Sequence, residues 1–348
     1  MSSSDAHRDE EILHSGDEED DSVQHPNSED ESGGEQDPEL GEENPEQDKD
    51  TTPGRWVGSS VTFDAINWLY TSRRVPPEVA CRIPGNEIEP RPQEGERVVF
   101  LAHFQRGFGL PVSDFFNRFL SVYNLQPHHL PANAVFHLSC FATFSEGYLG
   151  LWPMVETWRK FYSFRGMTIP DKKKKIKDLM QCGAASIQPK IGSELPRIKG
   201  LESVRKWQRT FFYVKNKSRT QDFIRLPPFR MGVPSRTGWR AALTETTETR
   251  MMDERVEAMT GEGLRGYDLV GTFIQRRVLP LQRRDRKICY MSGLMDPTRT
   301  STFAISNEEL YRQCRAIASV PKMSTWKWGI RAYSQKNPPP KVDRKSVV

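Results

Sequence analysis

The chain has 348 residues, and its 50 Lys and Arg against 46 Asp and Glu give a formal net charge of +4. It has no run of about 18 apolar residues, which excludes a membrane-spanning helix and predicts no membrane partner. Its five cysteines are widely spaced and never form a C-x-x-C pair. This argues against a disulfide scaffold and favours a reducing, intracellular compartment.

The small net charge of the whole chain is the sum of a strongly acidic N-terminal segment and a strongly basic remainder. Residues 1–50 contain 20 Asp and Glu but only Arg8 and Lys49 as basic residues, a net charge of −18. The remaining 48 basic and 26 acidic residues give +22. The acidic segment has no aromatic residue and too little apolar surface to offset the entropy of ordering. We therefore expect residues 1–55 to be a disordered acidic tail.

Next in the chain, residues 61–71 (VTFDAINWLYT) predict a short helix. Ser60 is the expected N-cap, and Phe63 and Ile66 are expected on one face together with Tyr70. Residues 75–95 contain five prolines, which is typical of a linker or an extended arm.

Residues 97–164 form the expected helical core. Between Phe100 and Phe164 lie 16 of the 35 aromatic residues, and aromatic side chains dominate protein cores. Gly107 and Gly109 predict a turn, because glycine tolerates positive φ. Four helices are expected here, at 97–106, from the N-cap Ser113 onward, from Pro131 onward, and at 152–164.

The rest of the body is expected to be mixed. Short strands are predicted near 184–214, at 184–189 and 210–214, because both segments are short and bounded by turn-forming residues. Helices are expected at 246–259, 264–277 and 307–317. The predicted fold class is therefore mainly α with a small α+β element. The expected domain spans 60–325, with a mixed part at 165–325, and residues 333–348 form a loose tail.

Several motifs of the core are similar to one known family. They are residues 96–100 (ERVVF), 103–111 (HFQRGFGLP), 125–134 (LQPHHLPANA) and 146–150 (EGYLG). They resemble the plant putative gypsy-type transposon domain, and the resemblance extends over roughly residues 60–320. It implies a transposon-derived or retrotransposon-derived origin but no particular reaction.

The motifs of an active mobile element are missing. The chain has no Asp-Thr-Gly or Asp-Ser-Gly triplet, no polymerase-type Asp-Asp pair and no C-x₂-C-x₄-H-x₄-C knuckle. We therefore expect no enzyme activity, no catalytic residue and no cofactor. The alternative is a degenerate transposase or nuclease, with Asp64, Asp114, Glu146 and Glu156 as its candidate carboxylates.

Four histidines lie outside the acidic tail, all within 35 residues. A zinc site from His103, His128, His137 and Cys140 is one interpretation, because His137 and Cys140 share a helix face. The favoured interpretation places His128 and His129 in a turn or cap and expects no metal, since no second closely spaced ligand pair exists.

Two basic clusters are the predicted nucleic-acid-binding sites. One consists of Lys172, Lys173, Lys174, Lys175 and Lys177; the other consists of Arg276, Arg277, Arg283, Arg284, Arg286 and Lys287. Each could bind phosphates or act as a nuclear import signal, and a solvated charged face is the alternative. Trp207, among basic neighbours, could stack on a base, although a core position is favoured.

Together these features favour a non-enzymatic, Gag-like protein that binds RNA or DNA nonspecifically, associates with itself, or does both. The nucleus is favoured over the cytoplasm. A nuclear protein-interaction module without nucleic-acid contact is the alternative. The acidic tail would compete with nucleic acid for the same basic clusters and lower nonspecific affinity.

Overall fold

The computed structural model describes residues 54–274, except residues 73, 146–147, 149–152, 170–178, 194, 199–200, 202, 241–243 and 262. These residues belong to one unit of internal contacts, residues 38–348. The acidic tail up to residue 53, the helix predicted at 307–317 and the tail at 333–348 lie outside the described residues.

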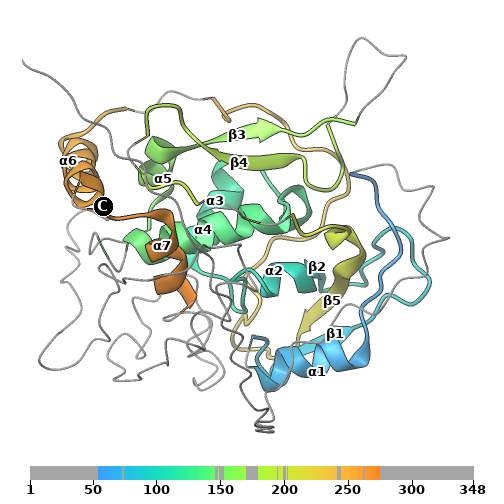
Figure 1. Ribbon diagram of the computed structural model, residues 1–348. Coiled ribbons are helices and arrows are strands. Elements are labelled where there is room, and N and C mark those ends of the chain that lie inside the picture. Colours follow the sequence, from blue (N-terminus) through green and yellow to red (C-terminus); the bar gives the residue numbers. More distant parts are fainter. Residues whose placement is uncertain are drawn as a thin grey trace, which may run out of the picture. The chain divides into compact units, whose positions relative to one another are not determined.

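Helices and short strands are interspersed along the chain (Figure 1). The α-helices are α1 (Phe63–Thr71), α2 (Leu101–Phe104), α3 (Asp114–Val122), α4 (Ala132–Phe144), α5 (Val155–Phe161), α6 (Thr247–Gly261) and α7 (Gly266–Phe273). The 3₁₀ turns are η2 (Pro127–His129) and η4 (Trp207–Thr210). The strands are β1 (Val79–Arg82), β2 (Glu96–Phe100), β3 (Tyr162–Gly166), β4 (Ala185–Pro189) and β5 (Phe211–Asn216).

The strands form two small antiparallel sheets. One has the order β1-β5-β2, with Cys81 opposite Val214 and Val98 opposite Tyr213. The other pairs β3 with β4. The strands predicted near 184–214 are confirmed as β4 and β5. The described part of the chain is a mixture of helices and small antiparallel sheets, so the structure supports a mixed fold and does not clearly support a mainly α one.

Two strands, β2 and β3, occupy residues for which sequence periodicity predicted a helix. β2 occupies the start of the helix predicted at 97–106, which shrinks to α2. The cause is tertiary, because Val98 and Val99 are β-branched and pair with the buried strand β5. β3 replaces the end of the helix predicted at 152–164 by pairing with β4. β1 lies within the proline-rich segment at 75–95 and agrees with the extended arm that was one of the two predictions for it.

The end signals of the helices were predicted more reliably. Ser113 caps α3 and accepts a hydrogen bond from its backbone, and Pro131 immediately precedes α4, both as predicted. The cap predicted at Ser60 is wrong, since the Thr62 side chain caps α1 instead. The predicted inward face of α1 is also partly wrong, because Phe63 is 83% exposed.

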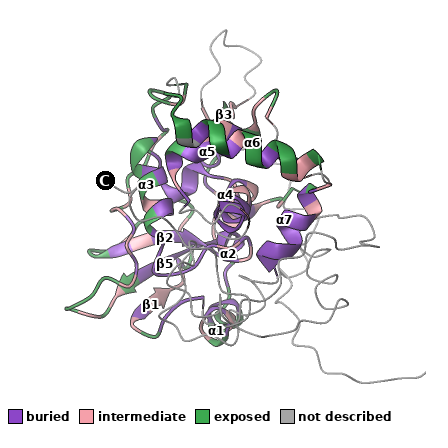
Figure 2. Ribbon diagram, turned by 90° about the vertical axis from the view of Figure 1, so that its left-hand side faces the viewer, coloured by how far each residue is buried: buried purple, intermediate pink, exposed green. Residues whose placement is uncertain are grey.

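The core surrounds α4, which is apolar on nearly all sides and buried along most of its length (Figure 2). Val135, Leu138 and Phe141 are buried as predicted. A second apolar cluster lies on the β1-β5-β2 sheet and includes Trp56 and Trp207. Helix α6 buries only one side and exposes the rest of its surface.

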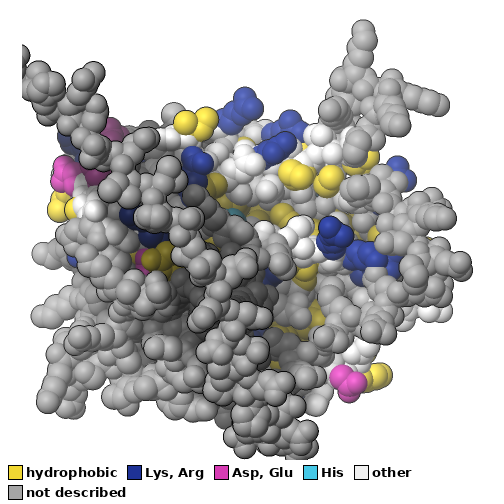
Figure 3. Space-filling view, in the orientation of Figure 1, with side chains coloured by type: hydrophobic (Ala, Val, Ile, Leu, Met, Phe, Trp, Pro, Cys, Tyr) yellow, Lys and Arg dark blue, Asp and Glu magenta, His cyan; other side chains and the backbone are white. Residues whose placement is uncertain are grey.

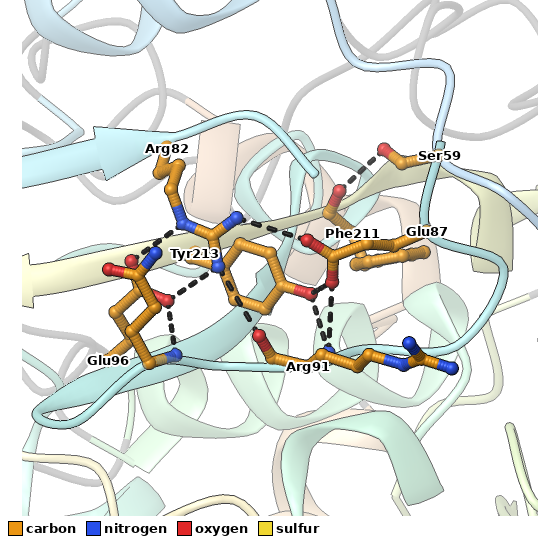
Figure 4. A network of polar contacts seen from close by, with 8 residues as sticks. Ser59, Arg82, Glu87, Arg91, Glu96, Phe211 and Tyr213 are labelled. Carbon is orange, nitrogen blue, oxygen red and sulfur yellow. Dashed lines mark hydrogen bonds and ion pairs between the residues drawn. The ribbon is translucent and has the colours of Figure 1, made fainter. Parts of the chain in front are cut away.

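A polar network fastens the proline-rich segment to this sheet (Figure 4). Arg82 donates two hydrogen bonds to Glu96, at 2.8 and 2.7 Å, and one to Glu87 at 3.1 Å. Its guanidinium also lies 3.9 Å from the centre of the Tyr213 ring. The backbone N–H of Arg91 donates to the Tyr213 hydroxyl at 2.7 Å. Because these groups satisfy one another, we assign the network a structural role.

Candidate nucleic-acid interface

Both basic clusters predicted from the sequence lie outside the described residues. They are Lys172–Lys175 with Lys177, and the six basic residues between Arg276 and Lys287. Their role in nucleic-acid binding therefore stays a prediction. The described part of the chain nevertheless carries a third concentration of positive charge.

This third concentration, which we call the basic segment, is residues 205–240. It contains ten Lys and Arg and a single acidic residue, Asp222. None of the ten is buried. They are Arg205, Lys206, Arg209, Lys215, Lys217, Arg219, Arg225, Arg230, Arg236 and Arg240. In Figure 3, Lys and Arg side chains gather over the β3–β4 sheet and beside the segment that leads into β5.

The fold separates the apolar and basic residues of this segment. Phe211 to Val214 are buried in β5, and farther along Ile224 and Leu226 are buried on either side of Arg225. The Asp222 side chain accepts hydrogen bonds from the backbone N–H groups of Ile224 and Arg225, at 2.8 and 3.0 Å. This turn holds Arg225 at a φ of 59° and leaves its side chain partly exposed.

The basic segment also forms one wall of an open groove. The groove has a volume of about 950 Å³ and lies between α3, the turn after it and the loop at 221–230. Its lining residues are Asn117, Arg118, Leu120, Ser121, Asn124, Leu125, Gln126, Gln221, Asp222, Arg225, Leu226, Pro227 and Arg230. The lining thus combines three guanidinium groups, four side-chain amides, one hydroxyl and one carboxylate with four apolar side chains.

Within the described residues, two of these arginines form ion pairs at the protein surface. Arg118 pairs with Glu156 at 3.3 Å, and both side chains are more than half exposed. Arg225 pairs with Asp114, whose side chain is 78% exposed. Exposed pairs of this kind contribute about 0–1 kcal/mol. The guanidinium groups can therefore exchange these carboxylates for phosphate oxygens at little free-energy cost.

The Asn124 amide can donate into the groove, whereas the Gln126 amide nitrogen is buried. Arg230 donates to the Asn124 side-chain oxygen at 3.1 Å, which leaves the Asn124 amide nitrogen as a donor. Gln126 is only 2% exposed, and its Nε2 has no hydrogen-bond partner among the described residues. A buried donor without a partner is unusual, because such a group loses its hydration without compensation.

The histidines fill structural positions. His103 Nε2 donates to the Leu130 carbonyl at 3.0 Å. His129 Nδ1 accepts from the Gln126 backbone N–H, and its Nε2 donates to the Gly232 carbonyl, both at 3.0 Å. The prediction that His129 acts as a turn and cap residue is therefore confirmed.

Burial sets the charge of the same histidines. It lowers the pKa of His103 to about 3 and those of His129 and His137 to about 4. It also lowers the pKa of His128 well below its ordinary value, and the adjacent His129 lowers it further. These rings are neutral at pH 7, so they add nothing to the positive surface.

The side-chain groupings proposed for chemistry do not form in the described part of the chain. There, no three His, Cys, Asp or Glu side chains are arranged to hold a metal ion. The zinc interpretation from His103, His128, His137 and Cys140 is therefore unsupported. Of the candidate carboxylates, Asp114 and Glu156 pair with arginines, and Glu146 lies outside the described residues.

Trp207 takes the core position that the sequence favoured. It is 6% exposed, and its ring stacks on His103 with centroids 5.4 Å apart. Its indole face is therefore covered by protein. The groove, in contrast, was not predicted from the sequence. The ratio of ten basic residues to one acidic residue in 205–240 does indicate a basic surface there.

The comparison with protein families finds one similarity, within the core. Residues 98–166, from β2 to the end of β3, match the model of the family described as putative gypsy type transposon. This segment is similar to that family. The resemblance drawn from the HFQRGFGLP and LQPHHLPANA motifs is thereby confirmed, since both lie within the match.

The other comparisons add no relative. The chain matches no curated protein and no solved structure. Among the helices that the structure describes, none combines the length and apolarity needed to cross a membrane. The groove residues at 221–230 lie outside the family match, whereas those from Asn117 to Gln126 lie inside it.

Proposed function

We propose that this protein is a non-enzymatic, Gag-like nucleic-acid-binding protein of transposon origin. The observation that carries the proposal is the basic segment, whose ten exposed or partly exposed Lys and Arg face a single acid. Positive charge at this density attracts phosphate backbones regardless of sequence. The family match supports the origin, and the +22 charge outside the acidic tail supports the class of partner.

Binding would rest on ion exchange. Each Lys or Arg that contacts a phosphate releases a condensed counterion, so affinity falls steeply as salt rises. The groove arginines Arg118, Arg225 and Arg230 would take part, together with the clusters at 172–177 and 276–287. The acidic tail, at −18, would compete with nucleic acid for these positions.

The test is fluorescence anisotropy of the full chain with labelled RNA and DNA oligonucleotides at 50 and 200 mM salt. We expect binding to both at low salt and strong weakening at high salt. Deletion of residues 1–50 should tighten binding. Absence of binding at low salt would overturn the proposal. Mg²⁺-dependent cleavage of the oligonucleotide would favour the degenerate nuclease instead.

The second candidate is a nuclear protein-interaction module that does not bind nucleic acid. It is favoured by large apolar side chains that face solvent, among them Phe63 at 83% and Ile88 at 66% exposure. Partner binding through such side chains would persist or strengthen at high salt. Light scattering of the full chain over a concentration series, at low and high salt, distinguishes salt-insensitive self-association from nucleic-acid-driven assembly.

A further inference from the structure

We propose that the groove between α3 and the loop at 221–230 selects single-stranded over double-stranded nucleic acid by binding unpaired bases. This inference rests on the proposed function and deepens it. The basic surface explains why phosphates bind, but it does not distinguish one nucleic-acid form from another. The groove has the chemistry to do so.

The rim of the groove supplies the phosphate contacts. Arg118 and Arg225 come from opposite walls, α3 and the basic segment, and both are partly or mostly exposed. Arg230 is exposed beside them. Guanidinium groups on both walls allow a flexible backbone to cross the opening with successive phosphates paired to arginine.

The interior of the groove suits a base. Four side-chain amides line it, and an amide can both donate and accept hydrogen bonds, as the edge of a base can. They are Asn117, Asn124, Gln126 and Gln221. The Gln126 Nε2 donor has no hydrogen-bond partner among the described residues. Leucine and proline side chains complete the lining and provide apolar contact for a base face: Leu120, Leu125, Leu226 and Pro227. The volume of about 950 Å³ lies in the range of small-molecule sites.

Geometry favours the single strand. In a duplex the base edges that form Watson–Crick pairs are occupied, and the bases are stacked inside a stiff, convex helix. Only unpaired nucleotides can turn a base into a recess while their phosphates stay at its rim. A duplex would contact the rim arginines alone.

The experiment compares one labelled single strand with the duplex of the same sequence, using the full chain at fixed low salt. The test variant is the double substitution Asn117→Ala and Gln221→Ala. Alanine favours the helix at position 117, and Gln221 is exposed, so the variant should fold. The matched control is Gln188→Ala, an exposed amide on β4 away from the groove.

We expect the wild type to bind the single strand at least tenfold more tightly than the duplex. The double variant should lose about tenfold in single-strand affinity and keep its duplex affinity, as expected for two lost hydrogen bonds. Gln188→Ala should change neither. Equal wild-type affinity for both forms, or an equal loss for both in the variant, would overturn the inference and leave the proposed function intact. No binding to either form would overturn both.

Discussion

Arg82 shows how one residue holds a long proline-rich segment in place. Its side chain is 31% exposed, whereas its partner Glu96 is only 5% exposed. The Arg82 guanidinium keeps the pKa of Glu96 below its ordinary value of 4.5, and burial only partly opposes this effect. The arginine therefore supplies the main counter-charge for this almost fully buried carboxylate, and Lys215, opposite Glu96 on β5, adds a smaller one.

Replacing Arg82 with Ala should lower the free energy of unfolding at pH 7 by about 2–4 kcal/mol, because it removes the main counter-charge and two hydrogen bonds of the buried Glu96 carboxylate. Urea denaturation measures the change. Arg91→Ala is the matched control, since Arg91 joins the network through its backbone and its side chain is exposed. Equal losses in the two variants would refute the role assigned to Arg82.

Buried histidines make the stability of the fold sensitive to acid. Burial lowers the pKa of His103 to about 3, so its folded form resists protonation while its unfolded form protonates near 6.5. The stability linked to each such histidine is complete above pH 6.5 and is lost as pH falls towards the folded pKa. The loss per histidine is roughly 1.4 kcal/mol per pH unit between these limits.

The free energy of unfolding should therefore decline between pH 6.5 and 4.5. His103→Gln removes one titrating histidine, so the slope of the unfolding free energy against pH should fall by about 1.4 kcal/mol per pH unit. Urea titrations of both proteins at half-unit pH steps measure the slopes. A wild-type stability that stays flat from pH 7 to 5 would contradict the assignment of these rings as buried and neutral.

At the scale of elements, Gly107 sets the turn between α2 and α3. Its φ is +98°, and an added Cβ would lie 2.5 Å from Ser139 Oγ on α4 and 2.7 Å from the ring of Phe273 on α7. Glycine is thus required both by backbone conformation and by close packing of two helices against the turn. The turn predicted from the Gly-x-Gly motif is confirmed at this residue.

Gly107→Ala should destabilise the protein by more than about 2 kcal/mol, because strain and overpacking add. Gly85→Ala is the control, since Gly85 also has positive φ, at +60°, but nothing lies within 4 Å of its added Cβ. It should show backbone strain alone, about 1 kcal/mol. Thermal unfolding measures the Tm of both variants. Equal shifts in Tm would show that close packing at Gly107 adds nothing to the backbone strain.

The sequence predicted helices and strands correctly where neighbouring residues determine them. The Ser113 cap and the start of α4 after Pro131 depend on neighbouring residues, so both were predicted correctly. β2 depends on pairing with β5, more than 100 residues later, and its apolar residues also fit a helical period. The groove likewise joins Asn117 to Gln221 across the fold, so charge counting could indicate its basic wall but not its shape.

At the scale of the whole molecule, we propose that exposed Lys and Arg side chains bind phosphates through ion exchange. The most direct measurement is the slope of log affinity against log salt concentration for a single strand, in the wild type and in a variant with Arg118, Arg225 and Arg230 replaced by Gln. We predict a steep wild-type slope that falls by about 0.7 for each arginine removed, or about 2 in all. An unchanged slope in the variant, or salt-independent binding by the wild type, would contradict the account.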